Sequence, residues 1–253
     1  MELINHKPTL KAIASGSDGN AYLIDVGGEK LLIECGVRWN DIMDAADFRT
    51  IDIVGCLVSH SHDDHMMSIK HVLRHHIDVY GTREEILNGT ENEEHYRMKF
   101  IEPNKPFMVG NFKVMAISTQ HDSPNPVGYL IKHPVMGTML FATDTFYLRQ
   151  KFSFPIHHIL LECNYDTNIL KSNLERGIID AKRYDRTFTT HMSLDNCIGT
   201  LKAIDLTELK NLMLIHLSSE NSNEHLCRKR VSRECNIDFD KICCATKNTI
   251  INL

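Results

Sequence analysis

The sequence predicts an α/β fold in which strands and helices form a sandwich. Three observations support this prediction. Short apolar runs of strand length fill much of the first 60 residues, helical spacing appears between later runs, and a second group of strands comes late in the chain. This order favours an α/β sandwich over a doubly wound parallel sheet.

The expected strands are apolar or alternating runs bounded by turn residues. In chain order they are TLKAIAS (9–15), AYLIDV (21–26), KLLIECG (30–36), IVGCLVS (53–59), DVYGT (78–82), FKVMAIST (112–119), VGYLIKH (127–133), TMLFATD (138–144), HHILLEC (157–163), NLMLIHLS (211–218), KICCAT (241–246) and TIINL (249–253). The turn-rich stretch GSDGN (16–20) separates the first two strands.

Helices are expected between these strands. In DHMMSIKHVLRHH (64–76), four apolar residues can share one helical face: Met66, Ile69, Val72 and Leu73. The other helical segments are REEILNG (83–89), the stretch 173–202 and the stretch 223–235. No repeat or linker is visible, so the chain is predicted to form a single domain over residues 1–253.

The composition limits the classes of function. The chain has 253 residues and 42% hydrophobic residues, which is enough for a sizeable core. A net charge of −5 argues against a protein that coats nucleic acid by charge alone, although it permits a local basic groove. The 8 cysteines form no CxxC pair, which is typical of reduced thiols in a cytoplasmic protein. No apolar run is long enough to cross a bilayer, so no membrane role is expected.

Polar side chains of the kind that bind metals follow several of the expected strands. The stretch SHSHDDH (59–65) comes directly after the strand IVGCLVS, and single histidines or aspartates end three later strands. The candidate metal ligands are His60, His62, Asp64, His65, His121, Asp144 and His216. Because strand ends are rigid supports, these residues are well suited to form one site.

Imidazoles and carboxylates together suit two divalent ions, with zinc or manganese favoured and iron also accepted. A shared carboxylate holds such ions about 3.5–4 Å apart, and a water between them loses a proton near neutral pH, which yields a hydroxide nucleophile. The alternative is that Asp63 and Asp64 only cap a helix. That interpretation explains neither the H-x-H spacing nor the later residues at strand ends.

The SHSHDDH stretch resembles the H-x-H-x-D-H signature of the metallo-β-lactamase-fold hydrolases, and the three later ligands match that superfamily's motifs in order. The resemblance covers nearly the whole chain. It implies a four-layer αββα sandwich with the site at one edge of the two sheets. It also implies that one ion is bound by His60, His62 and His121, and the second by Asp64, His65 and His216, with Asp144 as the bridge.

Further motifs indicate which branch of the superfamily the chain resembles. QHDSPNPVGYLI has a Gly-Tyr pair after His121, as in the nuclease and phosphodiesterase branches, and lacks the T-P-G-H-T stretch of glyoxalase-type members. ASGSDGNAYLI and HLSSENSN resemble the small single-domain hydrolases encoded with the Wal two-component system. That resemblance implies a 5′-to-3′ exonuclease acting on DNA. The chain lacks the insertions of the β-CASP nucleases and of many ribonuclease Z enzymes, which makes a dedicated RNA-processing role a weaker prediction.

The resemblance also assigns roles to residues beyond the ligands. In THMSLDN, His191 is similar to the extra histidine of the ribonuclease Z group that assists the leaving group, and it is predicted to act with Asp64 in catalysis. Glu34 stands where the superfamily usually has aspartate. Six polar residues are predicted to contact the substrate: Ser15, Ser17, Asn20, Ser218, Asn221 and Asn223.

Two other functions remain open at this point. A phosphodiesterase that cleaves cyclic or linear nucleotides fits the same ligands, and the net negative charge favours it slightly. A non-catalytic binding module stabilised by its metals is the other alternative, but degenerate members of a fold normally lose ligands and this chain has all seven. Since the exonuclease resemblance remains the leading interpretation, the predicted partner is a nucleic acid, preferably DNA.

Overall fold

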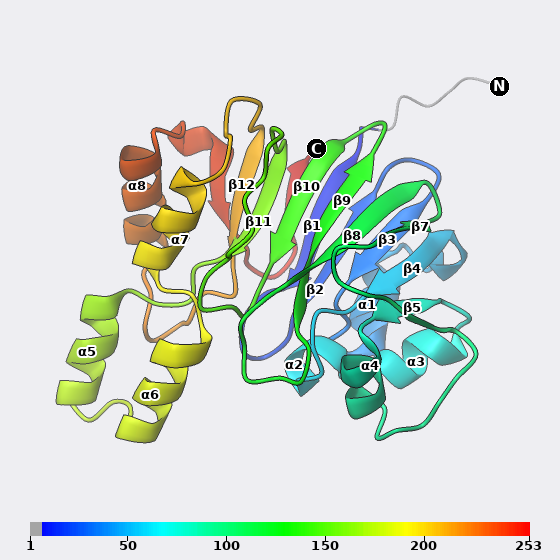
Figure 1. Ribbon diagram of the computed structural model, residues 1–253, viewed down its shortest axis with the longest axis horizontal. Helices are drawn as coiled ribbons and strands as arrows, with labels where there is room; N and C mark the ends of the chain where they lie inside the picture. Colours follow the sequence, from blue (N-terminus) through cyan, green and yellow to red (C-terminus); the bar gives the residue numbers. More distant parts are fainter. Residues whose placement is uncertain (1–6) are drawn as a thin grey trace. The chain divides into compact units, whose positions relative to one another are not determined.

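The computed structural model describes residues 7–253, which group into two compact units (Figure 1). The first unit contains the described residues up to Ser118, the segment Ser123–Gly137 and the C-terminal segment Thr246–Leu253. The second unit contains Thr119–Asp122 and Thr138–Ala245.

A seven-stranded mixed sheet forms the centre of the first unit. In spatial order its strands are β14 (Thr249–Asn252), β1 (Thr9–Ala14), β2 (Ala21–Asp25), β3 (Lys30–Ile33), β4 (Ile53–Leu57), β5 (Val79–Gly81) and β6 (Met98–Phe100). The strands from β14 to β3 pair antiparallel, whereas those from β3 to β6 pair parallel. Side chains of β2 and β3 are buried on both faces, which explains why their sequences are almost continuously apolar.

One face of this sheet is covered by short helices and the other by antiparallel strands. The helices are α1 (Trp39–Ala45), α2 (Asp63–Met66), α3 (Ile69–Arg74) and α4 (Arg83–Gly89), with a 3₁₀ turn at Thr50–Asp52. The covering strands are β7 (Pro106–Val109), β8 (Phe112–Ser118) and β9 (Val127–His133). At Gly55 a Cβ atom would meet the side chain of Val109, so glycine permits the close approach of the two layers.

The second unit contains four parallel strands and four helices. The strands are β10 (Gly137–Ala142), β11 (His158–Glu162), β12 (Asn211–Ile215) and β13 (Ile242–Cys244). The helices are α5 (Thr167–Glu175), α6 (Ala181–Thr190), α7 (Leu194–Lys202) and α8 (Glu224–Cys235), with a 3₁₀ turn at Phe239–Lys241. Asp166, Asp180, Ser193 and Asn223 cap the N-termini of these four helices through their side chains.

The predicted strands are found with small changes at their ends, whereas one helix prediction was wrong in detail. The segment 64–76 forms the two short helices α2 and α3 rather than one helix. Ser68 lies at the break, where its N–H donates to the Cys35 carbonyl and its hydroxyl donates to the Val37 carbonyl. These bonds hold the backbone away from a continuous helical path. None of the described helices is long and apolar enough to cross a membrane.

Candidate metal site

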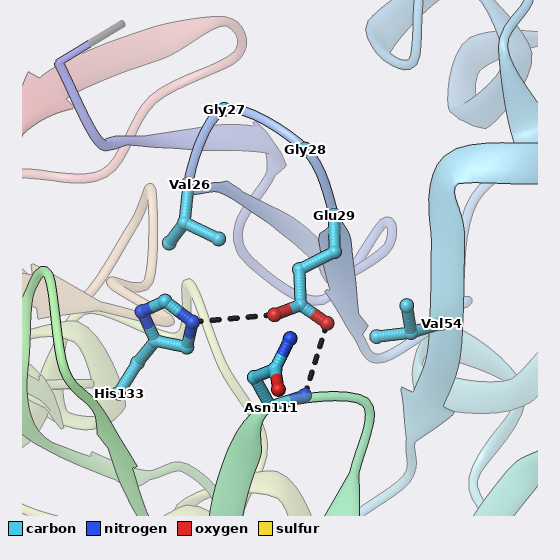
Figure 2. Close-up of a pocket in the computed structure, with 7 residues that line it drawn as sticks. All are labelled: Val26, Gly27, Gly28, Glu29, Val54, Asn111 and His133. Atoms are coloured by element: carbon cyan, nitrogen blue, oxygen red, sulfur yellow. Dashed lines mark hydrogen bonds and ion pairs between the residues drawn. The ribbon is translucent and has the colours of Figure 1, made fainter.

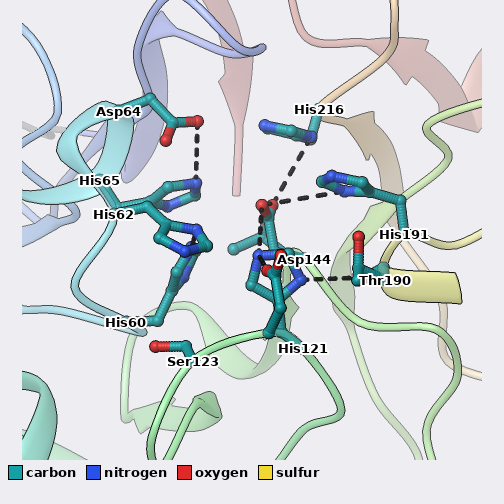
Figure 3. A network of polar contacts seen from close by, with 12 residues as sticks. His60, His62, Asp64, His65, His121, Ser123, Asp144, Thr190, His191 and His216 are labelled. Atoms are coloured by element: carbon teal, nitrogen blue, oxygen red, sulfur yellow. Dashed lines mark hydrogen bonds and ion pairs between the residues drawn. The ribbon is translucent and has the colours of Figure 1, made fainter. Parts of the chain in front are cut away.

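The chain after β4 gathers a first cluster of metal-binding side chains, defined as His60, His62, Asp64 and His65 (Figure 3). The Nε2 atom of His60 lies 3.1 Å from Nδ1 of His62. The rings of His60 and His65 have centroids 4.0 Å apart, and both side chains are buried. Asp64 Oδ2 lies 3.3 Å from Nε2 of His65. Imidazole nitrogens this close, with a carboxylate oxygen beside them, are the donor set that a divalent transition metal requires.

Asn20, from the turn before β2, supports the first cluster. It is fully buried, and its Oδ1 accepts from the N–H of Gly16 at 3.0 Å while its Nδ2 donates to the Gly16 carbonyl at 2.9 Å. The same Nδ2 lies 3.2 Å from Asp64 Oδ2 and 3.1 Å from His65 Nε2. Asn20 therefore fixes the orientation of two predicted ligands.

Two buried glutamates hold the backbone of the same cluster. Both carboxylate oxygens of Glu34 lie 3.2 Å from the N–H of Ser59, and Oε1 lies 3.7 Å from Nδ1 of His65. Glu85 accepts from the N–H of Ser61 at 2.8 Å. Glu34 thus lies behind the predicted ligands, and it reaches them from a left-handed backbone with φ of 62°.

A second cluster lies in the second unit and is defined as His121, Asp144, Glu162, His191 and His216. Figure 3 labels its histidines and Asp144. Nε2 of His121 lies 3.5 Å from Asp144 Oδ2, and Nδ1 of His216 lies 3.6 Å from Asp144 Oδ1. Ligand atoms of Asp144, Glu162, His191 and His216 all lie within 4.8 Å of one another. Carboxylates and imidazoles at this spacing also fit a divalent ion.

The ends of parallel strands position this second cluster. Asp144 follows β10 and His216 follows β12, and both have left-handed backbones with φ of 43° and 53°. Nδ2 of Asn164, just after β11, lies 3.0 Å from Nδ1 of His216 and donates to its carbonyl at 2.9 Å. The Thr190 carbonyl at the end of α6 lies 3.0 Å from Nδ1 of His121.

Glu162 was missed by the sequence analysis, although it ends a buried strand as the predicted ligands do. Its Oε1 lies 2.7 Å from Nδ1 of His191, and its Oε2 accepts from the N–H groups of Thr145 and Met192. Burial lowers the pKa of His191, but the charge and hydrogen bond of Glu162 outweigh this and raise the pKa above its ordinary value. Burial raises the pKa of Glu162, yet His191 outweighs it and the pKa is lowered. The two side chains thus form a buried pair that favours the imidazolium–carboxylate state.

The predicted substrate residues other than Asn20 occupy varied environments. Ser17 is exposed and Ser15 is half-buried. Ser218 accepts from the N–H of Asn221 at 3.1 Å, Asn221 is buried, and Asn223 caps α8. Their contact with a substrate stays a prediction, as does the Asn20 contact.

A separate pocket of ≈ 500 Å³ in the first unit lies at the turn between β2 and β3 (Figure 2). Glu29 lies in it, with Oε1 3.2 Å from Nε2 of His133 and Oε2 accepting from the N–H of Asn111 at 3.0 Å. The turn follows Asp25, whereas Asn20 precedes the opposite end of β2, so this pocket is distinct from the first cluster. Its polar groups bond to one another and form no cluster of ligands.

Comparison with known proteins identifies the family to which this fold and these two clusters belong. A profile of the metallo-beta-lactamase superfamily matches residues 14–191. The exodeoxyribonuclease YycJ of Bacillus anthracis is 24% identical over 236 residues, which cover 87% of this chain and 86% of that protein. The metallo-beta-lactamase fold protein YhfI from Bacillus subtilis has a TM-score of 0.73 at 18% identity and covers 97% of this chain and 99% of that one. A diphosphatase of the PhnP family has a TM-score of 0.67 at 12% identity, with 98% of each chain covered.

These matches confirm the predicted fold class over both units, and the fold implies a pair of divalent ions. The two clusters supply side chains suited to such ions. The chain therefore belongs to the metallo-β-lactamase superfamily, and it is a metal-dependent hydrolase.

Proposed function

We propose that the protein is a dinuclear metal-dependent phosphodiesterase that degrades DNA as a 5′-to-3′ exonuclease. The observation that carries this proposal is the position of His191, which is held by the buried carboxylate of Glu162 beside two ligand-type residues, Asp144 and His216. A protonated imidazole is the group needed to release the alkoxide of a phosphodiester. The similarity to an exodeoxyribonuclease along most of the chain supports DNA as the substrate.

The proposal assigns the metal ligands as follows. One ion would be held by His60, His62 and His121, a second would be held by Asp64, His65 and His216, and Asp144 would contribute to both. When bound, two divalent ions such as zinc or manganese, or iron, activate water for attack and offset charge on the phosphate oxygens. The donor types of the two clusters support this assignment, because imidazoles and carboxylates predominate in both.

His191 supplies a proton to the leaving oxygen. Its Nδ1–H donates to Oε1 of Glu162 at 2.7 Å, which leaves Nε2–H for transfer to the substrate. The carboxylate stabilises the imidazolium before transfer and fixes the ring orientation, while the backbone N–H of Met192 fixes the carboxylate. Glu162 is a positioning residue in this scheme. The catalytic role proposed for Asp64 is that of a ligand to the second ion.

The leaving-group dependence of the rate tests the role of His191. A His191→Gln variant is expected to lose about 10²–10⁴-fold in kcat on DNA, whose leaving alkoxide needs a proton. The same variant should lose far less on a p-nitrophenyl phosphodiester, because that leaving group departs without one. A Glu162→Gln variant should show the same pattern with a smaller loss. Equal losses on both substrates would argue that His191 only orients water.

A direct test of the proposed function begins with counting the metals of the purified protein. A 5′-phosphorylated linear strand, a circular strand and a cyclic dinucleotide are then compared, with Asp144→Ala as the control. Degradation of the linear strand alone is expected. Cleavage of the circle would contradict an exonuclease, and absence of metal-dependent turnover on all three would favour a binding module.

A phosphodiesterase acting on small nucleotides is the second candidate. The fold similarity to a diphosphatase and the net charge of −5 favour it. Turnover of the cyclic dinucleotide alone would support it over the nuclease. For either substrate we place the protein in the cytoplasm, because all eight cysteines are free thiols.

A further inference from the structure

The segment between β10 and β11 has an unusual composition for this acidic chain. Residues 145–157, TFYLRQKFSFPIH, form neither helix nor strand and begin directly after Asp144. They include two basic residues and no acidic one. They also include four aromatic residues: Phe146, Tyr147, Phe152 and Phe154. Loops of this length without regular structure are uncommon in compact proteins, and they are usually either functional or linker segments.

The first half of this 145–157 loop is anchored to the second cluster. The N–H of Thr145 donates to Oε2 of Glu162 at 2.8 Å, and the N–H of Phe146 donates to the carbonyl of Gln120, the neighbour of His121. Nδ2 of Asn196 donates to the Phe146 carbonyl at 3.0 Å. The loop is therefore bonded to Glu162, which contacts the proposed proton donor His191, and to Gln120, which precedes the proposed ligand His121.

The anchored loop directs an aromatic ring and cations to its surface. Leu148 is buried beneath the loop, whereas Tyr147 is 37% exposed and Phe154 is 41% exposed. Arg149 and Lys151 are exposed. Nε of Arg149 donates to the hydroxyl of Tyr147 at 3.0 Å, and its guanidinium lies 5.7 Å from the ring centroid. Within residues 7–253, no carboxylate forms a salt bridge with either cation.

Several other basic residues of the second unit are paired with carboxylates, unlike Arg149 and Lys151. On α6, Arg183 pairs with Glu220 and Arg186 pairs with Asp122. On α8, Arg230 contacts carboxylates of two other elements as well as Glu234 on its own helix. The 145–157 loop thus combines exposed rings with positive charge that its own unit does not offset.

We propose that the 145–157 loop binds single-stranded nucleic acid, with bases stacking on Tyr147 and Phe154 and phosphates contacting Arg149 and Lys151. Exposed rings next to cations are what a flexible strand requires, because every unpaired base has a face to stack and each nucleotide carries one negative phosphate. A duplex also offers phosphates, but its bases stack on one another and leave no face for an aromatic side chain. This inference rests on the proposed function, since the loop adjoins the second cluster and would present the strand to it.

Fluorescence anisotropy with the metal-loaded full chain tests the inference. The probe is a labelled oligothymidine of about 12 nucleotides, within the range bound by other single-strand sites. Its phosphorothioate linkages resist cleavage and keep their charge. The double variant Tyr147→Ala/Phe154→Ala should bind at least about 30-fold more weakly, whereas Tyr147→Phe should bind as the parent does. The double variant Arg149→Ala/Lys151→Ala should lower the slope of log K against log salt by about 1.4, at about 0.7 per phosphate contact.

Tyr96→Ala is the matched control, because Tyr96 is 69% exposed and has the Arg97 guanidinium 5.1 Å from its ring. Its affinity should be unchanged. An abasic strand should bind the parent protein about as weakly as oligothymidine binds the aromatic double variant. Equal affinity of the parent protein for both strands, or an equal loss in the Tyr96 control, would overturn the inference.

Turnover of bis(p-nitrophenyl) phosphate separates this inference from the proposed function. The small diester needs no strand contact, so the loop variants should hydrolyse it as the parent does. If the parent hydrolyses no diester at all, the proposed function fails, while the anisotropy results still decide on the loop. If the parent hydrolyses the diester and the aromatic variant still binds the strand normally, only the loop inference is overturned.

Discussion

Replacement of Asn20 by alanine should weaken both the fold and the metal affinity of the first cluster. The buried side chain accepts one hydrogen bond from Gly16, donates one to the Gly16 carbonyl and shares its second donor between Asp64 and His65. Two neutral bonds contribute about 1 kcal/mol each, and the bond to a carboxylate contributes about 1.5–3 kcal/mol. The free energy of unfolding of Asn20→Ala should therefore fall by about 3.5–5 kcal/mol.

Urea unfolding in the presence of a chelator measures this change without a contribution from metal. Titration with zinc or manganese then gives a second measurement, and loss of a group that orients ligands should raise the Kd about 10- to 100-fold. Asn20→Asp should be worse than alanine despite its similar shape. It places a second carboxylate about 3.2 Å from Asp64, where the repulsion reaches about 5 kcal/mol at an effective dielectric of about 20.

The exposed Asn111 provides a control, since Asn111→Ala should stay within about 0.5 kcal/mol of the parent. An Asn20→Ala protein with the parent's stability and the parent's metal affinity would refute the reasoning. If that variant instead lost only its affinity for a DNA strand, Asn20 would be a substrate contact as the sequence predicts.

Three further changes probe other contacts. A Cβ atom on Gly36 would collide with the backbone carbonyl of Asp64, so Gly36→Ala should lower the Tm by about 6–12 °C for a cost of about 3 kcal/mol, measured by calorimetry. Glu34→Asp withdraws the carboxylate from the Ser59 N–H and should raise the Kd for metal about 10-fold; an unchanged titration would contradict this role. Burial raises the pKa of Tyr165 to about 12, so ionisation favours the unfolded chain above pH 10, and stability is lost as the pH rises to about 12. In urea unfolding, Tyr165→Phe should therefore lose up to about 2.7 kcal/mol less stability than the parent between about pH 10 and pH 12. The same pH profile in both proteins would count against this reasoning.

The strands could be predicted because burial on one or both faces leaves a direct trace in the sequence. VGYLIKH and REEILNG became β9 and α4 with the predicted ends. The strand β6 was missed because it has three residues and buries only Met98, so its pairing depends on the backbone alone. The helix α1 was missed for a similar reason, since only Trp39 and Ile42 are buried among its seven residues.

The site follows the same logic. The predicted ligands were chosen because they follow apolar strands, and Glu162 has the same signal at the end of the strand in HHILLEC, although it was not chosen. Glu85 has no such signal, because it lies beside the exposed Glu84 in one short helix and only the fold distinguishes the two. Its bonds to the N–H groups of Ser61 and Asn125 come from segments 24 and 40 residues away, which no local pattern encodes. The orienting role of Asn20 is hidden in the same way, since Asp64 lies 44 residues further along the chain.

The left-handed backbone at Glu34, Asp144 and His216 affects which substitutions evolution or protein engineering would favour at these positions. Each such non-glycine residue costs about 1–3 kcal/mol, and glycine at the same position would relieve that cost. Selection for thermal stability alone would therefore favour glycine at these three positions, two of which hold predicted metal ligands. If these three residues have the proposed roles, turnover and stability would be opposed at their positions, so a stabilised version of the enzyme should be sought with all three held constant.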